Sequence, residues 1–222
     1  MNHETVNKLN IIKSEINNKI LSLNFNNYTP NIIAVTKTFS LDKIEPLIKE
    51  GHIHFGENKV QEALNKWQAI KEKKENLKLH MIGKLQSNKV KFTVGFFDYL
   101  HSVDSLRLAE KIANEQQKKK LKPKIFLQVN IGGEDQKSGV FIDNLIELYN
   151  RSVKDFNLNV IGLMCLPPEN NDPREYFSKT KKLNDELKLE QLSMGMSNDY
   201  LKALEYKSTY LRIGSKIFGS RN

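Results

Sequence analysis

Short runs of β-branched and aromatic residues alternate with longer segments of helical period along the whole chain. This alternation is typical of parallel βα units, in which a helix returns the chain to the starting edge of the sheet after each strand. Eight such units close a (β/α)₈ barrel. We therefore predict an α/β fold, with residues 1–222 as a single TIM-type barrel domain. The predicted strands are 31–36, 52–57, 77–83, 97–103, 124–131, 159–167, 191–196 and 210–214.

The size and composition of the chain agree with one domain. Its 222 residues, 39% of them hydrophobic, suit a single core. No apolar run approaches the ~20 residues that a membrane span requires, and the polar N-terminus lacks the apolar segment of a secretory signal. The single cysteine, Cys165, lies in an apolar run, where we expect a packed side chain, and agrees with a reducing compartment. We expect a cytoplasmic protein without a membrane partner.

The formal net charge of +9 is compatible with binding to nucleic acid. The main basic runs, 71–74 and 118–120, are separate and stand at the ends of predicted helices, where the helix dipole stabilises cations and water solvates them. No basic motif is interleaved with aromatic residues. We expect no nucleic-acid partner, and weak attraction of anions remains the alternative.

Helix candidates lie between the strands, and one more precedes them. Ser40 and Asp104 stand where they can cap the helices after the first and fourth strands. The prolines of 166–176 prevent the sixth strand from running directly into a helix. An additional N-terminal helix over 4–23 is predicted to pack on the barrel through one face, formed by Val6, Leu9, Ile12, Ile16 and Ile20.

In barrels of this type the ligand lies at the C-terminal ends of the strands, so the residues that close each strand run are the functional candidates. Lys37 follows the first strand, with only Thr36 after the apolar run. A lysine at the end of a buried strand is partly desolvated, which favours the neutral amine that attacks an aldehyde. A solvated loop charge is the alternative. The other residues at strand ends are Glu57, Asn58, Gly83, Asn130, 164–167, Ser197, Asn198, Gly214 and Ser215.

Two segments near the C-terminus combine glycine and serine. In 193–199, Ser197 precedes a predicted helix and offers a hydroxyl beside free backbone N–H groups, which suits a phosphate, although it could also only cap that helix. In 211–219, two glycines permit close backbone approach and Arg212 projects from the last strand, although an ordinary strand and turn is the alternative. Phosphate sites of these barrels often use the loops after strands seven and eight. Together with Lys37, they predict pyridoxal 5′-phosphate as the cofactor.

Six segments carry a resemblance to a known family. They are AVTKTFS at 34–40, FGENKVQEA at 55–63, LHMIGKLQSNK at 79–89, LMCLPP at 163–168, LSMGMSND at 192–199 and YLRIGSKIFG at 210–219. With them the chain resembles the pyridoxal phosphate homeostasis protein family, a relative of the alanine racemase N-terminal barrel, from about residue 31 to residue 221. Cys165 stands where a small residue is common in the family.

The resemblance implies a carrier or regulator of pyridoxal phosphate in vitamin B6 homeostasis. The residues that it assigns to the cofactor are Lys37 for the Schiff base, Ser197, Gly214 and Ser215 for the phosphate, Arg212 for the pyridine nitrogen, and Asn58 and Met164 for the ring.

An arginine partner has a chemical consequence. Because arginine stays charged, it does not readily give a proton to the pyridine nitrogen, which makes the ring a weaker electron sink. The chain stops at Asn222, whereas alanine racemases add a β-domain with a catalytic tyrosine. We expect a non-catalytic monomer or weak homodimer, with cofactor-dependent apo-enzymes as candidate partners. The alternative is an amino-acid racemase or decarboxylase with its acid/base from Tyr176 or a second copy.

Two further groups of residues need an assignment. Lys137 is a candidate secondary cofactor site, with a solvated charge as the alternative. The histidines in or beside strands lack the spacing of a metal site and are predicted to be polar groups of the core or of the barrel top. They are His52, His54, His80 and His101.

Overall fold

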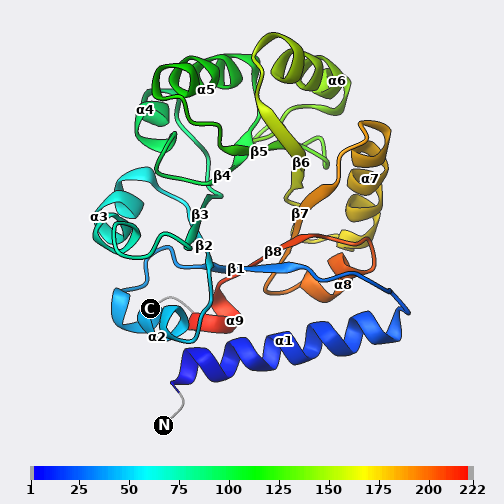
Figure 1. Ribbon diagram of the computed structural model, residues 1–222. Helices are drawn as coiled ribbons and strands as arrows, with labels where there is room; N and C mark the ends of the chain where they lie inside the picture. Colours follow the sequence, from blue (N-terminus) through cyan, green and yellow to red (C-terminus); the bar gives the residue numbers. More distant parts are fainter. Residues whose placement is uncertain (1–2, 220–222) are drawn as a thin grey trace.

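The computed structural model describes residues 3–219, in which eight parallel strands close into a barrel in chain order (Figure 1). This confirms the predicted fold class. Each strand lies within its predicted run and ends at most two residues short of it. The strands are β1 Asn31–Val35, β2 His54–Glu57, β3 Lys78–Met81, β4 Tyr99–Val103, β5 Lys124–Val129, β6 Asn159–Cys165, β7 Gln191–Met196 and β8 Tyr210–Ile213.

The barrel closes between its first and last strands. Asn31 of β1 is paired with Tyr210 of β8, and Ala34 with Ile213. Because a parallel barrel is covered on both faces, its strands are almost continuously buried, which explains the unbroken apolar runs in the sequence. The pairing of Ala34 with Ile213 places the C-terminal ends of β1 and β8 side by side.

A ring of helices surrounds the strands in Figure 1. The additional helix α1, Glu4–Ser22, buries the predicted face from Val6 to Ile20 and packs on α2, α8 and α9. No helix within residues 3–219 is long and apolar enough to cross a membrane. The other helices are α2 Leu41–Lys49, α3 Val60–Lys71, α4 Val90–Thr93, α5 Leu106–Lys119, α6 Ile142–Asn150, α7 Pro173–Glu186, α8 Tyr200–Leu204 and α9 Ser215–Phe218, with helical turns η1 Ser87–Lys89 and η2 Arg151–Asp155.

Helix boundaries follow local chemistry, with one correction. The prediction that Asp104 caps α5 is wrong: the helix begins one residue later, and the extended Ser105 accepts a hydrogen bond of 3.4 Å from the N–H of Leu108. Asp172 caps α7, and Pro173 occupies its first turn, where a missing N–H costs nothing. The prolines thus separate β6 from α7 as predicted.

The buried side chains form two layers. The larger layer lies between the strands and the helices and includes Trp67, Phe55 and Phe177. The smaller apolar layer lies inside the barrel and includes Phe126 and Met164. Polar side chains are buried here as well, and buried polar groups require hydrogen-bond partners.

Candidate functional site

Lys37 lies in the turn after β1 and is partly buried. The preceding residue, Thr36, is fully buried, and its N–H, carbonyl oxygen and hydroxyl all form hydrogen bonds. Its N–H donates to the carbonyl oxygen of Gly56 at 2.9 Å, and its hydroxyl donates to Oε1 of Glu57 at 2.7 Å. Nζ of Lys66 donates to the Thr36 carbonyl oxygen at 2.8 Å. The backbone that presents Lys37 is therefore fixed to its neighbour β2 and to α3.

Glu57 is the centre of this support. Its fully buried Oε1 also accepts hydrogen bonds from Nζ of Lys66 at 3.0 Å and from Nε1 of Trp67 at 2.9 Å. Oε2 of Glu57 is buried without a hydrogen-bond partner among the described residues. Sequence reasoning placed Glu57 at the strand ends but gave it no role. The available signal was an acidic residue directly after two apolar positions of a buried strand.

The turn continues through Thr38, which adopts a left-handed conformation with φ of 66°. For a β-branched residue this is an uncommon and strained backbone geometry, of the kind that concentrates at functional sites. Oε1 of Glu62 accepts a hydrogen bond of 2.6 Å from the Thr38 N–H. The strain is thus maintained immediately beside Lys37.

Arg212 projects into the barrel from β8 and is 4% exposed. Nη1 donates to Oγ of Ser193 at 2.6 Å, and Nη2 donates to the carbonyl oxygen of Cys165 at 2.9 Å. Among residues 3–219, Arg151 and Arg174 form ion pairs with carboxylates, whereas Arg212 forms none. Burial lowers the pKa of Arg212, although the guanidinium remains a cation at neutral pH. Within residues 3–219, the hydrogen-bond partners of this desolvated positive charge are therefore neutral.

Ser197 and Gly214, both predicted to bind a phosphate, contact each other. Oγ of the buried Ser197 accepts hydrogen bonds from the N–H of Gly214 at 3.3 Å and from the N–H of Lys216 at 3.5 Å. The alternative that Ser197 caps its own helix is wrong, because α8 begins at Tyr200 with Asp199 in the capping position. Ser215, the first residue of α9, is exposed beside them.

The two residues predicted to line the cofactor ring differ in burial. Asn58 follows β2 and is partly buried, and its backbone touches Gly83 so closely that a Cβ there would lie 2.3 Å from the Asn58 carbonyl oxygen. Met164 is fully buried in the inner layer with Ile33 and Phe126. Because Met164 is buried, we expect it to lie below the cofactor ring and not at the entrance of the site.

The strand register connects these residues. Arg212 is paired with Ile33 on β1, the strand that Lys37 follows. Lys37, Asn58, Ser197, Gly214 and Ser215 follow or close β1, β2, β7 and β8 at their C-terminal ends, and Arg212 approaches them from inside the barrel. An amine, a guanidinium, hydroxyls and backbone N–H groups thus share one end of the barrel.

Cys165, Lys137 and Tyr176 are further candidates. Cys165 is fully buried, and burial raises the pKa of its thiol to about 11, which confirms a packed side chain. Lys137 forms an ion pair of 2.7 Å with Glu134 and lines a pocket with Tyr176. The hydroxyl of Tyr176 accepts a hydrogen bond of 2.7 Å from Asn171. A secondary cofactor site at Lys137 stays a prediction.

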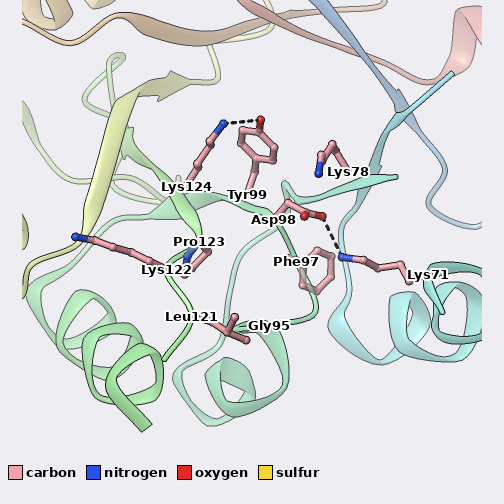
Figure 2. A pocket seen from close by; sticks show the side chains of 10 residues that line it. All are labelled: Lys71, Lys78, Gly95, Phe97, Asp98, Tyr99, Leu121, Lys122, Pro123 and Lys124. Atoms are coloured by element: carbon pink, nitrogen blue, oxygen red, sulfur yellow. Dashed lines mark hydrogen bonds and ion pairs between the residues drawn. The ribbon is translucent and has the colours of Figure 1, made fainter. Parts of the chain in front are cut away.

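A pocket of about 290 Å³ lies at the opposite end of the barrel, at the N-terminal ends of β3, β4 and β5 (Figure 2). Figure 2 shows Lys71 paired with Asp98, at 3.0 Å, and Nζ of Lys124 directed to the hydroxyl of Tyr99, at 3.3 Å. These polar groups satisfy one another.

His80 and His101 are fully buried, which confirms the prediction of core positions for these two histidines. His52 and His54 are partly exposed and lie at the N-terminal end of β2, so they are neither fully in the core nor at the top of the barrel. Within the part of the chain that is described, no group of three or more histidine, cysteine or acidic side chains could hold a metal ion.

The chain is similar to proteins of a known family. Residues 15–222 match the family described as alanine racemase, N-terminal domain. The pyridoxal phosphate homeostasis protein of Aquifex aeolicus (strain VF5) is 40% identical over 199 residues, which cover 86% of each chain. That of Escherichia coli (strain K12) is 36% identical over 203 residues, again 86% of each chain.

Solved structures give the same result. PipY of Synechococcus elongatus PCC7942, solved with PLP bound, superposes with a TM-score of 0.80 and 32% identity, covering 92% of this chain and 100% of PipY. An alanine racemase of Clostridium difficile 630 shares the fold, with a TM-score of 0.71, but only 13% identity. This chain covers 56% of that racemase.

Proposed function

This chain belongs to the pyridoxal phosphate homeostasis proteins within the alanine racemase N-terminal domain family, and we propose that it binds pyridoxal 5′-phosphate as a carrier and regulator of that cofactor. The observation that carries the proposal is the buried Arg212 guanidinium. It has no carboxylate in ion-pair distance among residues 3–219 and lies on the strand beside the one that Lys37 follows. A desolvated cation in this position favours a ligand that supplies an acceptor.

The donors at this end of the barrel suit a phosphorylated aldehyde. Pyridoxal phosphate supplies an aldehyde that condenses with primary amines and a ring that withdraws electrons. We propose that Lys37 holds it as a Schiff base, because the fixed Thr36 backbone and the strained Thr38 turn keep this amine at the strand end. Arg212 would face the ring nitrogen from below.

The remaining residues have proposed roles at the two ends of the cofactor. Ser197 and Ser215 would bind the phosphate through their hydroxyls, and Gly214 through its backbone N–H, which in this structure donates to Oγ of Ser197. Asn58 and Met164 would line the ring from β2 and β6. The single domain that we propose for this function is residues 1–222.

The proposed role is non-catalytic. The relatives that share 36–40% identity are named as homeostasis proteins, whereas the racemase resemblance concerns the fold alone. An arginine beside the ring nitrogen leaves that nitrogen largely unprotonated, which weakens carbanion chemistry. A cytoplasmic monomer or weak homodimer that delivers the cofactor to apo-enzymes agrees with this role, and a nucleic-acid partner is not part of the proposal.

The binding site is tested by absorbance, borohydride reduction and peptide mapping. Wild-type protein mixed with pyridoxal phosphate should show the band of a protein-bound Schiff base and, after reduction, carry the label on the peptide with Lys37. Lys37→Ala should lose the band. The matched control is Lys84→Ala, which removes an exposed lysine from the loop after β3 and should keep it. Absence of a band in the wild type would overturn the proposal.

The non-catalytic role needs a separate experiment. Protein loaded with the cofactor is incubated with alanine, serine and other amino acids, and racemisation and decarboxylation are followed. Rates no higher than those of free cofactor support a carrier. Turnover well above that level, lost in Tyr176→Phe, would support the racemase or decarboxylase alternative instead.

A further inference from the structure

A chain of hydrogen bonds crosses the barrel interior beneath the candidate site. Nδ1 of His54 on β2 lies 2.9 Å from Nε2 of His80 on β3, and Nδ1 of His80 lies 2.9 Å from Nε2 of His101 on β4. Nδ1 of His101 lies 2.9 Å from Oγ of Ser193 on β7, which accepts the 2.6 Å hydrogen bond from Arg212 on β8. Side chains from five strands thus connect the N-terminal end of the barrel with the guanidinium.

The imidazole rings of this chain are fixed by stacking. His80 stacks on Tyr99 with ring centres 4.2 Å apart and planes 13° from parallel. His101 stacks on Phe126 at 4.3 Å and 22°. Both histidines are fully buried, so rotating a ring would displace packed aromatic side chains. The ring nitrogens therefore keep their directions.

The chemistry of arginine sets the direction of the hydrogen bonds. A guanidinium only donates, so Ser193 accepts from Arg212, and the partner left for the hydroxyl proton is Nδ1 of His101. Burial holds the pKa of His80 and His101 well below the ordinary histidine value, so each ring is neutral, with one donor and one acceptor. His101 then donates from Nε2 to His80, and His80 donates from Nε2 to His54.

We propose that Ser193, His101, His80 and His54 form a one-directional hydrogen-bond chain that holds Arg212 in place for the cofactor ring nitrogen. Ser193 and His101 are then positioning residues of the site. This inference rests on the proposed function only for the identity of the group that Arg212 faces. The chain itself concerns the protein alone.

A neutral chain has a different effect from a carboxylate partner. A carboxylate would neutralise Arg212, whereas a hydroxyl backed by imidazoles accepts one N–H and leaves the positive charge available to a ligand. Hydrogen bonds arranged head to tail also polarise one another, which strengthens the Ser193 acceptor. The protein thus fixes the guanidinium without cancelling its charge.

The far end of the chain reaches the floor of the barrel. The ring of His54 lies edge to face with Tyr99 and Tyr210, at 6.3 Å and 5.9 Å between ring centres. Tyr99 also lines the pocket of Figure 2, where the charged groups are Lys71, Lys78, Asp98, Lys122 and Lys124. The chain of hydrogen bonds therefore extends from His54, near this pocket at the N-terminal end of the barrel, to Arg212 at the candidate site.

The direction of the chain is tested first without cofactor. Full-length protein labelled with ¹⁵N-histidine is studied by NMR at neutral pH, where each ring reports which nitrogen carries the proton. The proposal expects His101, His80 and His54 all to be neutral with the proton on Nε2. A proton on Nδ1 of His101, or a charged ring at His101 or His80, would overturn it.

The link to the site is tested with Ser193→Ala. Loss of a hydrogen bond to a charged group should weaken pyridoxal phosphate binding by about tenfold, and the absorbance maximum of the bound cofactor should move. Ser193→Thr, which keeps the hydroxyl, should restore both. Ser208→Ala is the matched control, since Ser208 is equally buried but bonds to backbone groups of β7 and β8, and it should leave affinity and spectrum unchanged.

The outcomes separate the two proposals. Unchanged affinity and spectrum in Ser193→Ala would overturn the positioning role. A wild-type protein without a bound-cofactor band would overturn the proposed function, whereas the tautomers measured in cofactor-free protein would still decide whether the chain exists.

Discussion

The two ends of this barrel differ in how their buried and partly buried charged side chains are paired. At the N-terminal end, Lys71 is paired with Asp98, and Lys124 donates to Tyr99. At the C-terminal end, the described hydrogen-bond partners of Arg212 are neutral, and Oε2 of Glu57 has no hydrogen-bond partner among the described residues. The charged groups at the N-terminal end thus bond to one another, whereas the C-terminal end keeps groups that can still bind a ligand. This agrees with the general division of (β/α)₈ barrels into a stabilising bottom and a functional top.

The largest difference is expected from removing one acid at each end. Glu57→Ala removes the fully buried carboxylate that accepts hydrogen bonds from Thr36, Lys66 and Trp67, and it leaves Lys66 with the partly exposed Glu62 as its carboxylate partner among the described residues. It should cost about 3–5 kcal/mol of unfolding free energy. Asp98→Ala breaks a half-exposed pair and should cost about 1 kcal/mol. Urea denaturation of both variants measures the contrast. Equal losses would mean that the two ends do not differ in this respect.

Acid should act on the histidines of the interior and the floor. Burial lowers the pKa of His52 and of His54 to about 4, from an ordinary value of about 6.5. Between these values the unfolded chain binds more protons, so stability is complete above about pH 6.5 and is lost as the pH falls towards 4. We expect a loss of at least roughly 3 kcal/mol across this window, which corresponds to the shift of His52 alone, with a smaller share from the partly exposed His54.

Urea titrations at pH 7, 6, 5 and 4 measure this loss. His54→Asn should reduce the dependence on pH, whereas His3→Asn, at the exposed N-cap of α1, should not. A wild-type stability that is constant from pH 7 to 4 would contradict the burial of neutral histidines.

A smaller effect is expected from the tyrosines of the floor. The hydroxyl of Tyr210 donates to that of Tyr99 at 3.3 Å, so Tyr210→Phe should lower the unfolding free energy by about 1 kcal/mol. Cofactor affinity, measured by absorbance titration, should stay at the wild-type value. A parallel loss of affinity would show that the floor and the site are not separable.

The smallest change in stability is expected at Thr38, where glycine relieves the left-handed strain but adds chain entropy to the unfolded state. Thr38→Gly should change the unfolding free energy by less than about 1 kcal/mol. It should still weaken cofactor binding, because the turn beside Lys37 gains freedom. Lys207→Gly is the matched control, with φ of 56° on the surface, and should leave affinity unchanged.

Much of this architecture is predictable from the sequence, for a physical reason. Strands covered on both faces produce contiguous apolar runs, so the sequence predicts the positions of all eight strands. The topology then assigns Lys37, Ser197 and Gly214 to one end of the barrel, because ligands bind at the carboxyl ends of parallel strands.

The missing parts depend on register and on single-residue geometry. The contact of His101 with Ser193 joins residues 92 positions apart, and nothing in either strand alone shows that they share a level of the interior. The same holds for the support of Thr36 by Glu57 and Lys66. The choice of Ser105 over Asp104 as a cap depends on one residue of helix length, which periodicity does not resolve.

The pairing of β1 with β8 has a consequence for the synthesis of the protein. Asn31 leaves the ribosome roughly 180 residues before its partner Tyr210, a delay of about 10–40 s at a synthesis rate of about 5–20 residues per second. Until then β1 has an unpaired edge, and the lysine that follows it has no Arg212 beside it. The complete site exists only after the last strand joins, so uptake of cofactor by a nascent chain would mark the moment at which the barrel closes.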